Sequence, residues 1–214
     1  MLSKVDELVR SDHFYLDGQD DCYFLREYTS HQPFQFSETN QLIYNLKKSP
    51  DRKGRPEYRH KESAIRQVAG ELRDALNPDW LRFATLVPTP PSKARGDPLY
   101  DDRISRMLTA MGDNLDAREL VIQPASTTPD HGATARRLPA EISGLYQIDD
   151  RLVSPTPRLL GIFDDVLVTG AHYKAMKSLL RARFPDAPIV GLFVARRVFA
   201  NLSDDGGPAA ESAR

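Results

Sequence analysis

The feature that most constrains the fold is an apolar run that ends in two adjacent acids and a Thr-Gly turn. Residues 159–163 read Leu-Leu-Gly-Ile-Phe, Asp164 and Asp165 follow, and the turn lies at residues 169–170. Such a run predicts a strand buried on both faces of a parallel sheet. Apolar residues then recur at helical spacing over residues 171–184, which predicts a helix. This order of elements favours an α/β fold with a mostly parallel open sheet flanked by helices.

The polar residues of this segment indicate the chemistry of a ligand. Open α/β sheets bind ligands at the carboxyl ends of their strands. The carboxylates of Asp164 and Asp165 can accept hydrogen bonds from two neighbouring hydroxyls, and a glycine turn at a helix N-terminus suits a phosphate. A ribose 5-phosphate carries both groups. The alternatives are a pair of acids that only caps the helix, or the acidic cluster of a receiver-like domain.

These residues resemble the signature of the type I phosphoribosyltransferases, which use 5-phosphoribosyl 1-diphosphate (PRPP). The resemblance implies that Asp164 and Asp165 hold the ribose hydroxyls and that the turn holds the 5′-phosphate. The residues it assigns to the phosphate are Val168, Thr169, Gly170, Ala171 and His172. The chain departs from the family at two of them, because the family often has Thr or Asp at position 168 and usually Thr at position 172.

A second segment supports the same resemblance. An apolar run at residues 83–88 stops at a proline-rich turn, and basic residues follow before a helix expected at residues 99–112. This segment looks like the pyrophosphate loop of the family. Its candidate contacts are Thr89, Ser92, Lys93 and Arg95. The alternative is a proline-rich surface loop with solvated basic side chains.

A long polar segment, residues 123–146, has almost no large apolar side chain before Leu138. Such segments in compact domains are lids, binding loops or disordered chain. The resemblance makes this one the flexible catalytic loop, with Arg136 and Arg137 reaching the pyrophosphate. Closure of residues 123–142 would then exclude water. A disordered loop without a specific role for the two arginines is the alternative.

The order of the motifs is similar to that of the ComF-like subgroup. The shared features include Val-Pro-x-Pro at residues 87–90, Arg-Gly at 95–96, Ala-Arg at 195–196 and an apolar helix that ends in Lys47. ComF-like proteins commonly begin with a cysteine-rich zinc module, whereas this chain has the single cysteine Cys22. We therefore expect no cysteine-based zinc site. The histidines lack paired metal-ligand spacing, so the expected cation is Mg²⁺ held mainly by PRPP.

The chain divides into three parts by its composition. We expect an N-terminal extension with helices (1–55), a phosphoribosyltransferase-like core (56–200) and a disordered tail without apolar anchors (201–214). Residues 14–36 are expected to be irregular, and helices are expected at residues 38–48 and 57–76. The remaining core strands are expected at residues 119–122 and 188–194. At 40% apolar residues, the chain can bury one α/β core.

Charge and hydropathy bear on the partners. A net charge of −1 argues against general affinity for nucleic acid. The basic run at residues 47–61 is interpreted as a solvated face, and contact with a polyanion is the less favoured alternative. No apolar stretch reaches the length of a membrane span and the N-terminus lacks a signal-peptide core, so we expect a cytoplasmic protein without a membrane partner. A homodimer or a partner protein stays open.

The resemblance implies transfer of the phosphoribosyl group of PRPP to a nitrogenous small-molecule acceptor with release of pyrophosphate. The two carboxylates would stabilise positive charge on the ribose ring as pyrophosphate leaves. The acceptor would be bound by the N-terminal region and by the segment after Ala195, where Arg196 is a candidate contact. The second hypothesis is a regulatory, defence- or competence-associated module that binds PRPP or a nucleotide with little or no turnover, which Val168 and His172 favour.

Overall fold

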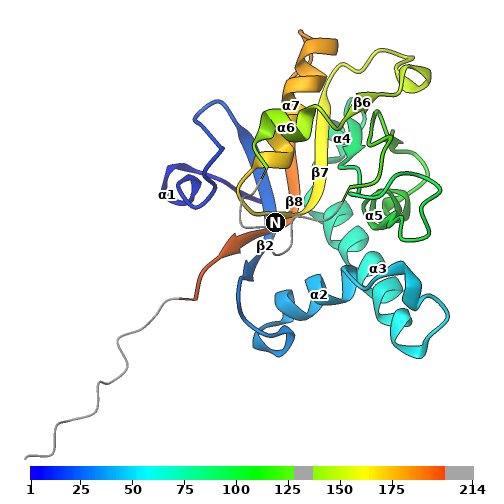
Figure 1. The fold of residues 1–214 in the computed structure, drawn as a ribbon. Coiled ribbons are helices and arrows are strands. Elements are labelled where there is room, and N and C mark those ends of the chain that lie inside the picture. Colours follow the sequence, from blue (N-terminus) through cyan, green and yellow to red (C-terminus); the bar gives the residue numbers. More distant parts are fainter. Residues whose placement is uncertain (128–136, 201–214) are drawn as a thin grey trace, which may run out of the picture.

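A six-stranded sheet forms the centre of the protein (Figure 1). The structure is a computed structural model that describes residues 1–127 and 137–200. Its strands are β1 (Ser3–Lys4), β2 (Asp21–Thr29), β3 (Thr85–Pro88), β4 (Asp116–Ala117), β7 (Leu160–Leu167) and β8 (Ile189–Val198). They are ordered β1-β2-β8-β7-β3-β4. β1 pairs antiparallel with β2 at one edge, and the other pairs are parallel. The predicted α/β fold with a mostly parallel open sheet is therefore confirmed.

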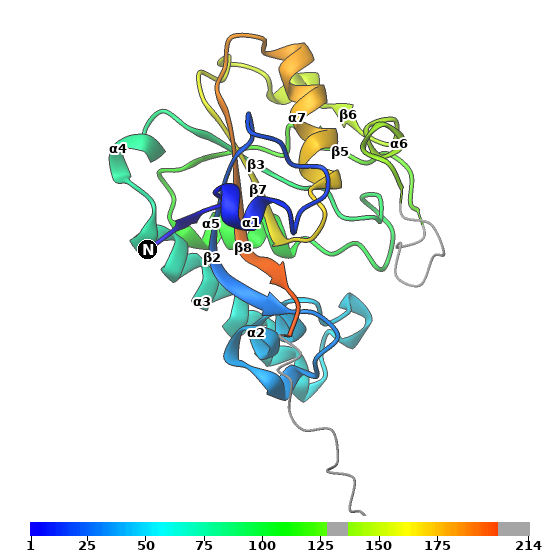
Figure 2. The ribbon, with the colours of Figure 1, turned by 90° about the vertical axis from the view of Figure 1, so that its left-hand side faces the viewer.

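Helices flank this sheet on both faces (Figures 1 and 2). They are α1 (Glu7–Arg10), α2 (Glu38–Leu46), α3 (Arg59–Ala75), α4 (Pro78–Leu81), α5 (Arg103–Met111), α6 (Pro139–Ser143) and α7 (Ala171–Arg183), with short 3₁₀ turns at Phe34–Phe36, Pro50–Arg52, Pro56–Tyr58 and Asp150–Leu152. Ile162 of β7 lies in one apolar cluster with Met176 of α7. Its neighbour Phe163 lies in a second cluster with Val68 of α3 and Met107 of α5. Alternate residues of one strand thus fill the two layers of the core.

The helices expected at residues 38–48, 57–76 and 171–184 are confirmed as α2, α3 and α7. The helix expected from residue 99 begins later, at Arg103. The strand before the acids is longer than expected, because β7 continues through Asp164 and Asp165 to Leu167. The acids therefore lie inside the strand rather than in the loop after it.

The core strand expected at residues 119–122 is wrong. β5 (Val121–Ile122) pairs with β6 (Gln147–Ile148) in a separate two-stranded sheet. The edge of the main sheet is β4 instead, which pairs with β3. The Thr85 hydroxyl donates to Asp116 Oδ2 at 2.7 Å across this pair, and Arg118 N–H donates to the Leu86 carbonyl. Residues 116–118 therefore occupy the hydrogen-bonding edge of β3, and residues 119–122 cannot pair with it.

The expectation of an irregular stretch at residues 14–36 is also wrong in part, because it contains β2. This strand runs parallel to β8, with Asp21 opposite Val190 and Thr29 opposite Val198. Cys22 and Phe24 pack in the α7 cluster, so β2 is a core strand. The N-terminal region and the residues assigned to the core therefore share one sheet. The expected tail, residues 201–214, lies outside the described residues.

Candidate functional site

Asp164 and Asp165 face opposite sides of the sheet, because successive side chains of a strand alternate. The Asp165 carboxylate contacts Arg103 of α5, and its Oδ1 lies 3.6 Å from Lys47 Nζ after α2. Asp164 faces the α7 side, where its charge adds to the effect of burial in raising the pKa of Tyr146. The adjacent acids thus do not form one parallel pair that takes both hydroxyls from the same side.

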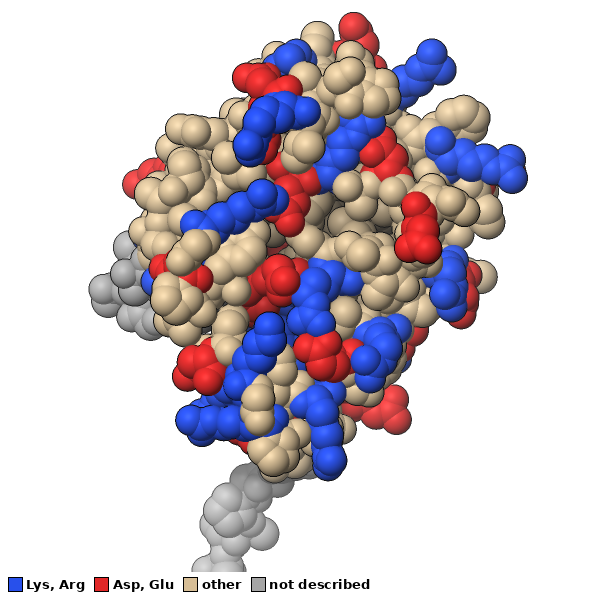
Figure 3. Space-filling model, turned by 90° about the vertical axis from the view of Figure 1, so that its right-hand side faces the viewer, with Lys and Arg blue, Asp and Glu red and all other residues tan. Residues whose placement is uncertain are grey.

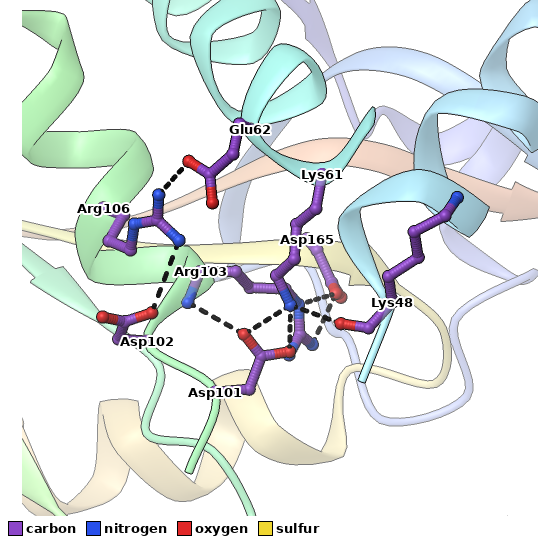
Figure 4. A network of polar contacts seen from close by, with 8 residues as sticks. All are labelled: Lys48, Lys61, Glu62, Asp101, Asp102, Arg103, Arg106 and Asp165. Atoms are coloured by element: carbon purple, nitrogen blue, oxygen red, sulfur yellow. Dashed lines mark hydrogen bonds and ion pairs between the residues drawn. The ribbon is translucent and has the colours of Figure 1, made fainter. Parts of the chain in front are cut away.

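Asp165 belongs to a buried chain of alternating charges (Figure 4). Its Oδ2 accepts hydrogen bonds from Nε of Arg103 at 3.0 Å and from Nη2 at 2.7 Å. Arg103 Nη1 also donates to Asp101 at 3.0 Å. Lys61 Nζ donates to both oxygens of Asp101 and to the Lys48 carbonyl, each at 2.7 Å. This network joins α2, α3, α5 and β7, and each buried charge in it has an opposite charge as partner.

The two acids differ in their affinity for a proton. Burial raises the pKa of Asp164, and the neighbouring Asp165 carboxylate raises it further. Burial acts on Asp165 in the same direction, but Lys47 and Arg103 outweigh it and hold the pKa of that carboxyl well below its usual range. Asp165 is therefore an anion at neutral pH, and Asp164 is the member of the pair that takes up a proton first.

The turn after β7 has the geometry of an anion site. Gly170 is left-handed, with φ 83° and ψ 3°, and stands at the N-cap of α7 without a side-chain cap. The first-turn N–H groups of a helix have no acceptor within the helix, so they suit a negatively charged ligand. The turn carbonyls are already used, because His13 Nδ1–H donates to Val168 at 2.7 Å and the Tyr15 N–H donates to Thr169 at 2.9 Å. We call residues 13–16 the N-terminal strap.

The strap also fills the space beside Gly170. A Cβ built on this glycine would lie 2.8 Å from Leu16 Cδ2. The space beside the Cα of Gly170 is therefore occupied by the side chain of Leu16. A phosphate at the turn has to approach from the side of the N–H groups of α7.

His172 contacts Tyr146, which follows α6 in the chain. Tyr146 Oη lies 2.7 Å from His172 Nδ1. Burial and the charge of Asp164 raise the pKa of Tyr146, so the phenol keeps its proton at neutral pH. Within the turn, the N–H of Ala171 donates to Thr169 Oγ1 at 3.4 Å.

The loop after β3 lines a small hollow. Its walls are Pro88, Thr89, Pro90, Pro91, Lys93, Arg95, Tyr100, Ser105, Glu119, Val121, Ile122 and Gln123. The N–H of Thr89 donates to the Phe163 carbonyl at 2.9 Å, so this residue lies beside the end of β7. Thr89 is only 6% exposed, and among the described residues its Oγ1 has no hydrogen-bond partner. This hydroxyl can therefore donate a hydrogen bond to a ligand.

Other predicted contacts in this loop are engaged within the protein. Arg95 forms an ion pair with Glu119, so a ligand has to open that pair to use its charge. The Ser92 carbonyl accepts hydrogen bonds from Gln123 Nε2 at 2.7 Å and from the Thr127 N–H at 2.8 Å. Ser92 is therefore joined to the segment before the undescribed residues.

The remaining predicted site residues lie further along the chain. Arg196 is part of β8 and not of a loop, and it is 7% exposed. It donates to Asp12 Oδ2 at 2.9 Å and to Glu27 Oε1 at 2.5 Å. Its charge is thus compensated within the protein. Arg137 begins the described segment that leads into α6, whereas Arg136 lies outside the described residues.

Several residues of the site carried no local signal in the sequence. Lys61 was assigned to a solvated basic face, and this is wrong, because its side chain is fully buried on Asp101. Arg103 is a charged residue near the start of a helix, where side chains are usually exposed, and nothing in the neighbouring sequence predicts its ion pair with Asp165. Of these residues only Lys47 has a local signal that bears on the site, as the basic end of the apolar helix before the core.

Metal ligands and membrane spans give no further site. Within residues 1–127 and 137–200, no group of His, Cys, Asp and Glu is arranged to hold a metal ion. No helix in the described part of the chain is both long and apolar enough to cross a membrane. On the face drawn in Figure 3, acidic side chains are interspersed among the basic ones, so that face carries no uninterrupted basic stripe.

The fold and the site define an α/β protein with an open, mostly parallel sheet and a polar site at the carboxyl ends of β3 and β7. Comparison with protein-family models and with curated proteins finds no match to this chain.

Proposed function

We propose that the protein binds PRPP at the carboxyl ends of β3 and β7 and transfers its phosphoribosyl group to a nitrogenous small-molecule acceptor, releasing pyrophosphate. One observation carries the proposal: a single strand carries Asp164 and Asp165, and the left-handed Gly170 follows shortly after that strand, at the start of the 13-residue helix α7. Hydroxyl acceptors and an anion site at this spacing suit a ribose 5-phosphate. The buried hydroxyl of Thr89, directly after the neighbouring strand β3, supports a ligand there.

Each part of PRPP has a candidate site. The 5′-phosphate would lie on the N–H groups that follow Thr169, and the ribose would lie over the end of β7, where Asp164 and Asp165 would approach it from opposite faces of the sheet. Asp165 would offer Oδ1, because Arg103 already holds Oδ2. The diphosphate would lie toward Thr89 and Lys93 in the loop after β3. Mg²⁺ would arrive as part of the substrate, held mainly by diphosphate oxygens.

The protein would promote the reaction electrostatically. As the bond to pyrophosphate breaks, positive charge develops on the ribose ring, and an anionic Asp165 stabilises it. The acceptor nitrogen then forms the new bond to the same carbon. The ComF-like subgroup and a cytoplasmic location belong to the same proposal. The contact of Lys47 with Asp165 supports the subgroup, because Lys47 ends the helix that the chain shares with it.

A second candidate function is PRPP binding without turnover. It is favoured by the apolar Val168 in the turn, which offers no group that can accept or donate a proton. It is also favoured by the pair of Arg103 with Asp165, since a carboxylate held by a cation stabilises a developing positive charge less. Pyrophosphate release with a panel of nucleobases and other nitrogenous acceptors separates the two functions.

Calorimetry with PRPP and Mg²⁺ tests the binding itself. Asp164→Asn is the sharpest variant, because it removes a charge without leaving Arg103 unpaired, and Asp164→Asn with Asp165→Asn removes both. Loss of a charged hydrogen bond costs about 1.5–3 kcal/mol, so we expect affinity to fall about tenfold or more. Asp150→Asn, a surface acid that pairs with Arg183, is the matched control and should bind normally. If the folded double variant bound PRPP as tightly as wild type, the assignment of Asp164 and Asp165 to the ribose would be wrong.

A further inference from the structure

Lys47 reaches the site from the N-terminal part of the chain. It follows α2 as its C-cap residue, and its N–H donates to the Ile43 carbonyl at 3.0 Å. Its ammonium lies 3.6 Å from Asp165 Oδ1, and its side chain is 37% exposed, compared with 6% for Asp165. Lys47 therefore stands between solvent and the buried acid, where a ligand for Asp165 has to pass.

The contact between Lys47 and Asp165 is loose. At 3.6 Å it is longer than the 2.7–3.2 Å of an ordinary N–H···O hydrogen bond. Arg103 supplies the close hydrogen-bonding partner of Asp165 through Oδ2, and Lys47 adds a second positive charge without a hydrogen bond of its own to the carboxylate. A ribose hydroxyl that bonds to Oδ1 would displace the ammonium from it. Because lysine is a point charge on a flexible stem, it can then turn to a second group of the ligand.

The position of Lys47 selects which group this is. Asp165 faces the layer of α5, and the loop that leads from β3 into α5 contains Thr89 and Lys93. α2 packs on α3, and α3 packs on α5, so Lys47 belongs to this layer. The turn at Gly170 leads to α7 on the other face of the sheet. Lys47 is thus on the side of the diphosphate and not on that of the 5′-phosphate.

We propose that Lys47 binds the 1-diphosphate of PRPP, which makes the N-terminal region a part of the substrate site. This inference rests on the proposed function, since it takes PRPP as the ligand. The ribose hydroxyl replaces the ammonium at Asp165 Oδ1, and the ammonium pairs with diphosphate oxygens that carry most of the charge of the ligand.

The test uses the full chain and two ligands that differ only at the anomeric carbon. Calorimetry would measure the affinities of two ligands, PRPP in the presence of Mg²⁺ and ribose 5-phosphate. Each would be measured for wild type, Lys47→Ala and Lys48→Ala. Lys48 is a matched control, because its ammonium bonds to Asn45 and lies 4.5 Å from the ring centre of Tyr44. We expect Lys47→Ala to weaken PRPP by about tenfold or more and ribose 5-phosphate by less than about twofold. Lys48→Ala should leave both affinities unchanged.

The other outcomes are separable. An equal loss for both ligands in Lys47→Ala would mean that Lys47 acts only through Asp165, and an equal loss in Lys48→Ala would mean a general charge effect. Either result, or unchanged PRPP affinity in Lys47→Ala, overturns the role of Lys47 but leaves the proposed function standing. If wild type binds neither ligand, the proposed function itself fails. Circular dichroism of each variant confirms that it is folded.

Discussion

The guanidinium of Arg103 donates two hydrogen bonds to a single oxygen of Asp165, from Nε at 3.0 Å and from Nη2 at 2.7 Å. The carboxylate of Asp165, which we expect to bind ribose, is therefore held in a fixed position without a ligand. The arrangement fixes the carboxylate and leaves Oδ1 turned to the more exposed Lys47. A side chain held in this way is preorganised for a ligand, since less rotational freedom is lost on binding.

Removal of Arg103 should be strongly destabilising. Arg103→Met leaves Asp165 and Asp101 buried without their shared partner, and breaking a buried ion pair typically costs about 3–5 kcal/mol. Urea unfolding measures the free energy. The matched control is Arg73→Met on the surface of α3, where the pair with Asp74 is exposed and the change should stay within about 0.5 kcal/mol. Equal stability of the two variants would show that the network contributes little.

Lys61 should be a second sensitive position. Its ammonium has three oxygen partners on Asp101 and Lys48, and its side chain is fully buried. Lys61→Met keeps the apolar stem but leaves the Asp101 carboxylate with Arg103 alone, so we expect a loss of about 2–4 kcal/mol in urea unfolding. Arg59→Met, an exposed residue of the same helix, should change little. If Lys61→Met lowered the free energy of unfolding as little as Arg59→Met does, Lys61 would be a solvated residue and not part of the buried network.

The raised pKa of Asp164 predicts a pH dependence with a definite sign. Burial and the charge of Asp165 make the folded state bind the Asp164 proton more tightly than the unfolded state does. The resulting stabilisation is complete below the ordinary carboxyl pKa of about 4 and is lost as the pH rises through the raised folded value. The stability of wild type relative to Asp164→Asn should therefore fall with increasing pH. Urea unfolding of both proteins across this range measures it, and a constant difference would contradict the shift.

Cys22 offers a test of the position of β2. It is the single cysteine of the chain and is fully buried, and burial raises its pKa to about 12. A thiol reagent should therefore react with the native protein only when β2 opens, and at once with protein unfolded in urea. Cys22→Ser gives the background. Equally fast labelling of native and unfolded protein would show that β2 is not a protected core strand.

The parts of the fold that the sequence predicted are those with local patterns. β7, the turn and α7 follow from an apolar run, a glycine and helical spacing within about 25 consecutive residues. β2 did not stand out, because Asp21, Arg26 and Glu27 interrupt its apolar alternation, and its strand character comes from pairing with β8 at the far end of the chain. Context of this kind overrides local propensity.

The charged network escaped for a related reason. Arg103 and Asp165 are 62 positions apart, and Lys61 and Asp101 are 40 apart, so no spacing rule joins them. Basic residues in a polar run are usually solvated, and only the packing of α3 against α5 buries Lys61. The strap at residues 13–16 was missed as well, because it binds carbonyls of a turn more than 150 positions away.

The last prediction separates the two reasons for a glycine at position 170. Gly170→Ala meets Leu16, because the new Cβ would lie 2.8 Å from Leu16 Cδ2, and it also places a side chain on a backbone with φ 83°. The left-handed conformation alone costs about 1–2 kcal/mol in a residue with a Cβ. Leu16→Ala removes the contact but not the dihedral cost. Compared with Leu16→Ala alone, adding Gly170→Ala should therefore lower the free energy of unfolding by only about 1–2 kcal/mol, and by more in the wild-type background. Urea unfolding of the four proteins gives this coupling. If the substitution costs the same in both backgrounds, the strap does not pack against the turn as described, and the space beside Gly170 is open to a phosphate after all.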